Sequence, residues 1–449
     1  MNKQKKLLVM LAVLVLVSAV TVMVVRREET KEKIKNTPAT VLEWSDISAV
    51  SWTYDGSSYA FEKTDDTWVY PEDTAFPVDQ EKMEDLLEQF EDLGAAFTIE
   101  DVEDYGQYGL EKPSCTITLT QGEETRTLEL GDYSKMDAQR YASLGDGNVY
   151  LLSHDPVEDF DIGLSDLIQQ DQVPAFAEVE AITLTGDQTD EFRKTKGQSL
   201  CREDEYFRDS DGGPLDTDLT ENYLKTLEKV SLTDYVTYKA TEEDLQNCYL
   251  DTPAQTVTVT YRPEEGEEAA TFTLHLGKAP DESEEKPGEA YARVGDSAIL
   301  YKISESQYQA LAACGYDDLR HQSLFTGDFS LAKELTVTLE GSTRVFTYEE
   351  QDNEEPAWYL GEEQVDLTDI QTALENLTAE AFTQEAPTGK EELSLTVKLD
   401  QEGENTLTLT FYRQDGTTVL AQANGKSLCT LPRAQVVTLT ESFNAILLG

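Results

Sequence analysis

The sequence FPVD at residues 76–79 opens a pattern that the chain contains three times. Its counterparts are GPLD at residues 213–216 and EQVD at residues 363–366. After the aspartate that ends each motif, apolar residues recur with the period of a helix that has one apolar face. Each aspartate can cap its helix by accepting backbone amide hydrogens. We therefore expect three helices that begin at equivalent points of three related units.

Strand patterns precede each predicted helix. Every copy has an aromatic strand end just upstream, at residues 68–70, 206–207 and 358–359. In the first and third copies an alternating apolar stretch comes before it, at residues 50–54 and 335–339. Asp55-Gly56 and Gly341-Ser342 are predicted to form the hairpin turns. These alternations indicate strands with one buried face.

A shared loop follows the helix in the first two copies. YGLEKP at residues 108–113 corresponds to CYLDTP at residues 248–253, and each leads into an alternating strand. Short helical stretches follow near residues 156–168 and 304–319. The third copy keeps two hairpin strands and a final helix near residues 433–448, but it lacks the loop. We interpret it as a degenerate copy.

The period of the pattern, about 140 residues, is far longer than the roughly 20 to 50 residues of a solenoid repeat. Each copy is therefore expected to have its own core. Hairpin signals dominate, and no strand–helix alternation indicates a parallel sheet. The sequence predicts an α+β protein with three tandem repeats of a mainly antiparallel sheet, each with one long helix packed on it. The predicted repeat domains are residues 46–172, 173–328 and, for the degenerate copy, 329–449.

The amino terminus contains a predicted transmembrane helix. Residues 7–25 have only Ser18 and Thr21 as polar side chains, and as a helix they would span about 28 Å, close to the thickness of a bilayer core. The run is too long for a cleaved signal peptide, and no cysteine follows it for lipid attachment. We expect a single-pass anchor in the lipid bilayer, with residues 1–6 as a cytoplasmic basic end and residues 26–45 as a polar stalk.

The membrane orientation follows from two opposing signals. Three lysines precede the apolar run and five basic residues follow it before residue 36, so the count of flanking charges favours a cytoplasmic body. A basic start followed by an apolar run is typical of a secretion signal, and long domains cross the membrane largely regardless of charge. We predict an extracytoplasmic body at the cell membrane, with the cytoplasmic body as the alternative.

The charge balance excludes one class of partner. The 449 residues include 35 basic and 89 acidic side chains, for a net charge of −54, which would repel nucleic acid. The sequence GKS at residues 425–427 resembles the end of a phosphate-binding loop, but Leu420 replaces the glycine that such a loop requires, so we expect a hairpin turn and no nucleotide. The acidic run at residues 209–214 does not fit a calcium loop, because Pro214 stands where a glycine is needed.

The cysteines and histidines give no sign of a catalytic or metal centre. The five cysteines lie far apart, which predicts neither a disulfide framework nor a zinc cluster, and Cys115 falls on a strand as a small buried residue. The three histidines are scattered, and His275 is expected to face outward from a strand. No motif for nucleophilic, zinc-hydrolytic or dinucleotide chemistry occurs. We therefore predict no catalytic residue and no cofactor.

The amino-terminal anchor, the strand that ends in Trp68, the turn at residues 76–79 and the loop at residues 108–113 resemble the bacterial domain of unknown function 4340. Residues 46–170 resemble it most, residues 178–320 keep the pattern with Tyr249 in place of Gly109, and residues 330–449 do so weakly. Members of that family are commonly encoded beside ABC-2 type permeases and gliding-motility-type auxiliary proteins. The resemblance implies a non-enzymatic scaffold, an accessory subunit of an exporter with a permease as partner.

The loops shared by the first two copies are candidate interaction sites. Their distinctive residues are Tyr108, Leu110, Pro113, Tyr249, Leu250 and Pro253. The simpler interpretation is structural, with the leucine as a plug and the proline at the start of a strand. Because a tyrosine replaces Gly109, we expect either that the two loops differ or that this position has an ordinary backbone conformation.

Two other functions stay open. The many tyrosines and the tryptophans could stack on sugars, which makes a cell-envelope glycan-binding module the main alternative. A glycoside hydrolase needs two carboxylates about 5 to 10 Å apart, a spacing that a sequence does not reveal.

Overall fold

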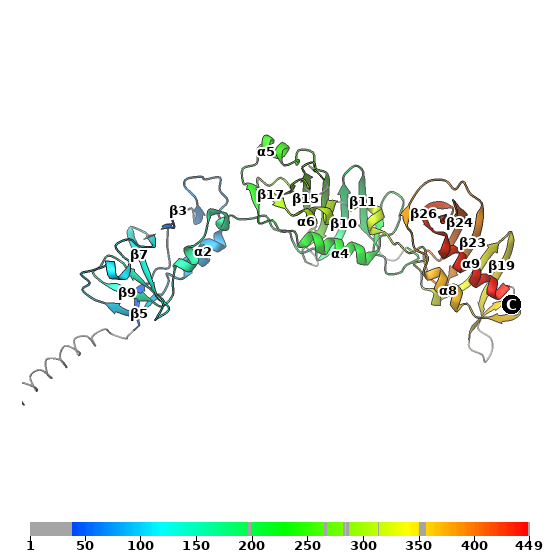
Figure 1. Cartoon of the computed structure of the whole chain (residues 1–449), viewed down its shortest axis with the longest axis horizontal. Helices are drawn as coiled ribbons and strands as arrows, with labels where there is room; N and C mark the ends of the chain where they lie inside the picture. The colour runs from blue at the N-terminus through cyan, green and yellow to red at the C-terminus, as the bar shows by residue number, and fades with distance from the viewer. Residues whose placement is uncertain are drawn as a thin grey trace, which may run out of the picture. The chain divides into compact units, whose positions relative to one another are not determined.

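The computed structural model describes residues 38–195, 199–264, 267–281, 283, 287–312, 314–349 and 356–447 (Figure 1). Contacts divide the chain into two compact units, one ending at Gln170 and the other beginning at Asp171. The predicted transmembrane segment, residues 7–25, lies outside the described residues. Within the described ranges, no helix is both long enough and apolar enough to cross a membrane.

The first unit contains a nine-stranded antiparallel sheet in the order β1-β5-β9-β8-β7-β6-β2-β3-β4. Its strands are β1 (Ala39–Leu42), β2 (Ala49–Tyr54), β3 (Ser57–Thr64), β4 (Thr67–Val69), β5 (Leu93–Ile99), β6 (Cys115–Gln121), β7 (Glu124–Ser134), β8 (Gln139–Ser143) and β9 (Val149–Leu152). Its helices are α2 (Gln80–Glu88), η1 (Gly106–Tyr108), α3 (Val157–Phe160) and η2 (Leu164–Leu167). Strand β1 corrects the predicted stalk, because Ala39 pairs with Ala95 and Leu42 is buried.

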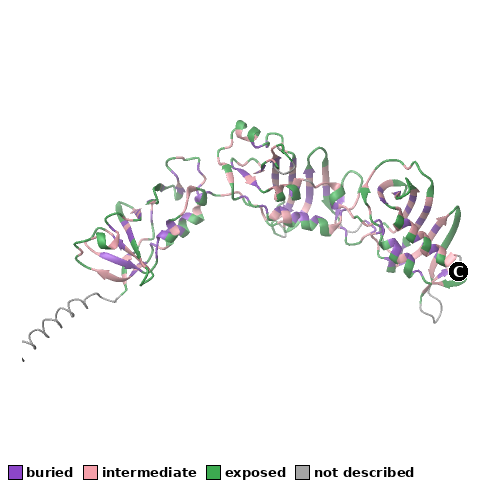
Figure 2. Ribbon diagram, in the orientation of Figure 1, coloured by how far each residue is buried: buried purple, intermediate pink, exposed green. Residues whose placement is uncertain are grey.

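The second unit begins with an eight-stranded sheet in the order β12-β11-β10-β14-β15-β16-β17-β13. Its strands are β10 (Glu178–Thr185), β11 (Thr189–Lys194), β12 (Tyr206–Arg208), β13 (Tyr235–Thr237), β14 (Gln255–Arg262), β15 (Ala270–Lys278), β16 (Ala290–Val294) and β17 (Leu300–Ile303). Its helices are α4 (Thr217–Glu228), α5 (Glu242–Asn247), α6 (Glu305–Ala312) and α7 (Tyr316–Leu319). The alternating burial along β14 shows that one face of the sheet forms the core (Figure 2).

The other sheet of the second unit has nine strands, in the order β21-β20-β19-β18-β23-β24-β25-β26-β22. Its strands are β18 (Ala332–Leu339), β19 (Ser342–Glu349), β20 (Ala357–Leu360), β21 (Glu363–Val365), β22 (Ala381–Phe382), β23 (Glu391–Leu399), β24 (Thr406–Arg413), β25 (Thr418–Ala423) and β26 (Lys426–Pro432). Its helices are η3 (Phe329–Leu331), α8 (Thr368–Glu375) and α9 (Arg433–Leu447). The predicted final helix near residues 433–448 is confirmed by α9.

The three sheets share one topology. In each, a hairpin is followed by a helix, then by a strand that pairs with the last strand of a four-stranded meander, and then by that meander, whose first strand pairs with the hairpin. The pairs that join hairpin to meander are β2–β6, β10–β14 and β18–β23, all antiparallel. This recurrence confirms the predicted repeats and the antiparallel sheets. In the second copy β10 takes the place of the alternating strand, which the sequence predicts only in the first and third copies.

The helices differ from the prediction of one long helix in each repeat. The helix after each hairpin has only 9, 12 or 8 residues, and further helices follow each meander, short ones in the first two repeats and the 15-residue α9 in the third. In the second repeat, Tyr223 on α4 donates a hydrogen bond to the carbonyl of Leu311 on α6 at 3.2 Å. A sheet of eight strands is about 35 Å wide and one helix about 10 Å across, so more than one helix is needed to cover a face.

The predicted helix caps form in two of the three repeats. The carboxylates of Asp79 and Asp216 accept hydrogen bonds from the amides of Lys82 and Leu219, each at 3.2 Å. In the third repeat the residue before the helix is Leu367, so the predicted cap is wrong. Asp366 accepts instead from the amide of Thr368, at 2.9 Å, because the helix begins one residue later.

Each of the predicted hairpin turns contains a glycine with a left-handed backbone. Asn424 and Gly425 have φ angles of 48° and 80° between β25 and β26, which confirms a turn in place of a phosphate-binding loop. The turn at Asp55-Gly56 is also confirmed. In the third repeat the left-handed pair is Glu340 and Gly341, so the predicted Gly341-Ser342 turn is wrong by one residue, since Ser342 already belongs to β19.

Candidate functional site

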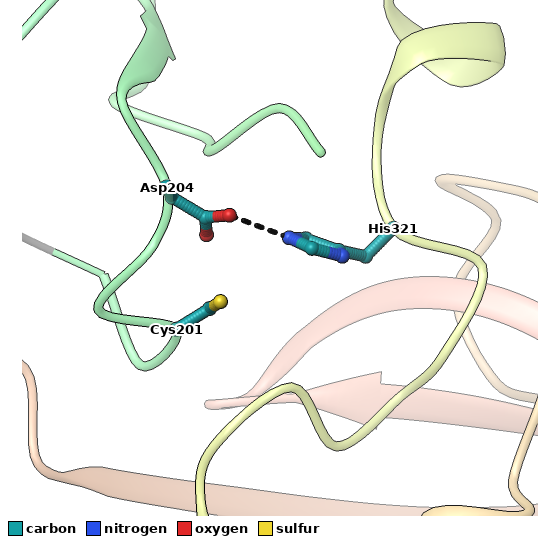
Figure 3. Close-up of side chains that lie close together, drawn as sticks. All are labelled: Cys201, Asp204 and His321. Atoms are coloured by element: carbon teal, nitrogen blue, oxygen red, sulfur yellow. Dashed lines mark hydrogen bonds and ion pairs between the residues drawn. The ribbon is translucent and has the colours of Figure 1, made fainter. Parts of the chain in front are cut away.

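Three side chains that are distant in sequence meet in the second unit. A sulfur, a carboxylate oxygen and a ring nitrogen of Cys201, Asp204 and His321 all lie within 4.8 Å of one another (Figure 3). Cys201 and Asp204 come from the loop between β11 and β12, and His321 follows α7. In Figure 3 the Cys201 sulfur points towards the space beside the Asp204 carboxylate and the His321 ring.

The loop that presents Cys201 and Asp204 is held by its own hydrogen bonds. Ser199 donates its hydroxyl to the carbonyl of Cys201 at 2.6 Å and to Oδ2 of Asp204 at 2.7 Å. The amide of Asp204 donates to the same Cys201 carbonyl at 3.3 Å. Asp204 is only 1% exposed, so its charge requires a partner in the interior.

His321 is that partner, and its ring lies between two carboxylates. Nε2 is 2.7 Å from Oδ1 of Asp204, and Nδ1 is 3.3 Å from Oδ2 of Asp216, the residue that caps α4. Burial lowers the pKa of His321, but the hydrogen bond to Asp204 and the charges of Asp204 and Asp216 outweigh it, so the pKa is raised. The arrangement therefore favours the charged imidazolium.

The Cys201 thiol is not set up as a nucleophile. Burial raises its pKa, and the charge of Asp204 adds to the rise, so the thiol keeps its proton at neutral pH. The Nε2 atom of His321, which would have to act as the base, is engaged by Asp204. The group thus differs from an activated cysteine–histidine pair.

The same region joins the second repeat to the third. Leu200, next to Cys201, is buried in the core of the third repeat, and its carbonyl accepts from Nε2 of Gln401 at 3.2 Å. The Arg320 guanidinium lies 3.4 Å from the ring centre of Phe382 and donates to the carbonyl of Leu428 at 3.2 Å. The joint therefore combines apolar burial, a cation–π contact and hydrogen bonds.

A cavity of about 980 Å³ lies beside this joint, between residues of the second and third sheets. The guanidinium groups of Arg208 and Arg320 lie 4.6 and 5.0 Å from the ring centre of Tyr316. Burial raises the pKa of Glu404 in the lining, as the acid of a glycosidase requires. Asp190, another carboxylate of the lining, is paired with Arg208, so it is not a free second carboxylate for Glu404.

The predicted interaction loops are built into the first two repeats and are not brought together with the cluster. Leu110 and Leu250 are each 5% exposed and act as plugs, while Pro113 and Pro253 are half-buried before β6 and β14. The ring of Tyr108 lies 5.0 Å from that of Tyr141. Tyr249 is 40% exposed, so it is the most accessible of the six.

The backbone of the two loops contradicts the expectation drawn from Tyr249. Gly109 and Tyr249 have φ angles of 73° and 56°, so both positions are left-handed and the two loops are alike. Each loop also lies against a glycine of the meander. A Cβ on Gly131 would lie 2.1 Å from the carbonyl oxygen of Tyr108, and one on Gly277 would lie 2.4 Å from that of Tyr249. Gly131 and Gly277, which end the sequences LELG at residues 128–131 and LHLG at residues 274–277, therefore make room for the loops.

Sequence reasoning missed the cluster of Cys201, Asp204 and His321. The spacing rules for metal ligands consider neighbours along the chain, and His321 is 117 residues from Asp204. Of the three scattered histidines, His321 is the one that joins this cluster. Residue His275 faces outward from β15, as predicted, and its Nδ1 lies 3.0 Å from the hydroxyl of Thr256.

The family model described as "Domain of unknown function (DUF4340)" matches residues 68–247 and, a second time, residues 210–398. Together the two matches cover well over half of the chain. The chain belongs to this family. The DUF4340 domain is thus present in tandem, and each match runs from one sheet into the next. No curated protein and no solved structure matches the chain.

Proposed function

We propose that this DUF4340 protein is a non-enzymatic, membrane-anchored scaffold with an extracytoplasmic body, which serves as an accessory subunit of an ABC-2 type, gliding-motility-like transporter. The observation that supports it best is the joint around Leu200 and Arg320. Domains of one chain move relative to each other unless an apolar interface holds them. Here Leu200 of one repeat completes the core of the next, which suits a surface that has to present two domains in a fixed register.

The chemistry of the cluster agrees with this role. Burial raises the pKa of the Cys201 thiol, and Nε2 of His321 is engaged by Asp204, so neither group is set up for nucleophilic or base catalysis. The apolar run at residues 7–25 would tether the body to the bilayer. The transporter as partner rests on the family resemblance.

Co-purification tests the proposal. The full-length protein, tagged at its carboxyl end and kept at native levels, is extracted from its own membranes in a mild detergent. We expect an ABC-2 permease subunit to be recovered with it in a constant ratio. Recovery of the protein with no transporter subunit would contradict the proposal.

A matched pair of variants sharpens the test. Arg320→Ala removes the contacts with Phe382 and Leu428 and should lower the recovery of the permease. Arg344→Ala removes an exposed arginine of β19 and should leave it unchanged. Equal recovery from both variants would show that the joint does not matter for the complex.

The glycan-binding alternative has less support in the structure. Trp52 and Trp68 are buried at 2% exposure, and Trp44 and Trp358 are half-buried, so the indole rings serve mainly for packing. Sedimentation with purified cell wall separates the two functions, because a glycan binder sediments and a scaffold stays in solution.

A further inference from the structure

We propose that Cys201, Asp204 and His321 form a binding site for a divalent transition-metal ion, zinc in the first place. Thiolate sulfur, imidazole nitrogen and carboxylate oxygen are the three donor types that zinc takes in proteins, at about 2.3, 2.0 and 2.0 Å. The three donor atoms already lie within 4.8 Å of one another. A thiolate and a carboxylate would also balance the charge of the ion.

The contacts of His321 and Asp204 with their neighbours determine which atom of each side chain an ion would take. A histidine that binds a metal usually donates its other ring N–H to a carboxylate, which fixes the orientation of the ring. Nδ1 of His321 faces Oδ2 of Asp216 at 3.3 Å, so Nε2, which bonds Asp204 here, is the ring nitrogen that an ion would take. Likewise, the Ser199 hydroxyl bonds Oδ2 of Asp204 at 2.7 Å, so Oδ1, which bonds His321 here, is the carboxylate oxygen that an ion would take. In Figure 3 these two atoms face each other across their hydrogen bond, and the Cys201 sulfur lies beside the pair.

Loading requires the spacing of the donor atoms to change. Nε2 of His321 and Oδ1 of Asp204 are 2.7 Å apart, whereas two such donors on a tetrahedral zinc are separated by about 3.3 Å. The ring and the carboxylate therefore have to separate by about half an ångström. The proton between them and the thiol proton of Cys201 leave for solvent as the ion binds.

The site has room for exchange with solvent. Cys201 is half-buried and the His321 side chain is 19% exposed, while Asp204 is buried. A fourth position open to water is thus expected. Because Cys201 and Asp204 belong to the loop of the second repeat and His321 to the segment that leads into the third, a bound ion would clamp the joint between them.

Cobalt(II) substitution tests the proposal on the full-length protein in detergent. Co²⁺ bound to a thiolate gives a sulfur-to-metal charge-transfer band in the near ultraviolet, and tetrahedral coordination gives strong visible bands. We expect both signals at one ion per chain, with Zn²⁺ displacing Co²⁺. Absence of the charge-transfer band from the wild-type protein, or its persistence in Cys201→Ser, would overturn the proposal.

Two further variants guard against misfolding. Cys314→Ser changes another half-buried cysteine outside the cluster and should keep the band. Asp216→Asn keeps the helix-capping oxygen but loses the charge that orients His321, and should weaken zinc binding by about 10- to 100-fold. Unchanged zinc affinity in Asp216→Asn, with a native circular dichroism spectrum, would count against the site.

Discussion

The backbone amide of Asp216 donates a hydrogen bond to the carbonyl oxygen of Leu319 at 2.8 Å. The first repeat contains the same bond, between Asp79 and Leu167, also at 2.8 Å. In both repeats the residue that caps the helix therefore also holds the segment that ends the repeat. In these two repeats the capping aspartate thus connects the start of the helix to the segment that ends the repeat.

Replacing these aspartates should destabilise their repeats. Asp79→Ala removes a helix cap and should lower the free energy of unfolding by about 1 kcal/mol. Asp216→Ala should cost more, because Asp216 also faces the ring of His321. Chemical denaturation monitored by circular dichroism gives both values. A smaller loss for Asp216→Ala than for Asp79→Ala would contradict the second contact.

The contact of Leu200 with the third repeat can be measured by truncation. Leu200 is 7% exposed, and Leu200→Ala should destabilise the second unit by about 2 to 5 kcal/mol, since it leaves a cavity in a core. Leu219 on α4 is 37% exposed and provides the control, because Leu219→Ala removes few contacts. Equal losses in the two variants would show that Leu200 does not complete that core.

The glycines beneath the loops should not tolerate a methyl group. Gly131→Ala and Gly277→Ala would place a Cβ 2.1 and 2.4 Å from backbone oxygens, which forces the loops to move and should cost about 1 to 3 kcal/mol or more. Gly416→Ala is the control, because a Cβ there meets nothing within 4 Å. Thermal melting of the three variants checks the order.

Tyr249 occupies a left-handed position that favours glycine. Tyr249→Gly and Tyr249→Ala both remove the exposed ring, but only alanine retains the steric cost of a φ near 56°. We expect the glycine variant to be the more stable of the two by about 1 kcal/mol. This reverses the order found at ordinary helix and strand positions. If alanine were the better residue in denaturation experiments, the backbone conformation at 249 would have to differ.

His275 should make the second unit sensitive to acid. Burial lowers its pKa from the usual 6.5, and the charge of Arg293 lowers it further. The folded state therefore resists a proton that the unfolded chain accepts, so stability is full above pH 6.5 and falls as the pH drops towards the lowered pKa. His275→Gln should show a smaller loss of stability between pH 7.5 and pH 5, and an equal loss in both proteins would contradict this.

Local sequence patterns predicted most of the secondary structure that the repeats share. They did not predict the contacts between residues that are far apart in the chain. The caps at Asp79 and Asp216 depend on residues three positions away, so the sequence contains their signal. The cap at Asp366 failed because a shift of one residue changes which side chain meets the first free amide. The backbone at Tyr249 is left-handed against the preference of tyrosine, and the loop there lies close against Gly277, 28 residues further along the chain.

The candidate site was beyond prediction for a related reason. Cys201 and Asp204 lie in a loop with no helical or strand periodicity, and His321 lies in the connection to the next repeat. Their meeting depends on how the end of the second repeat folds back to Asp216. The spacing of residues within one segment does not show which distant segment it will contact.

The burial of Leu200 in the core of the third repeat limits how recombination can rearrange the repeats of this gene. Tandem duplications usually let copies be lost, gained or exchanged by recombination between them. A crossover that separates residue 200 from the third sheet leaves that sheet with a hole in its interior, and leaves an apolar side chain in water at the new boundary. The last two copies are therefore expected to be inherited as a pair, and substitutions at Leu200 and Leu399, which both lie beside Gly327 in this core, should be correlated across descendants.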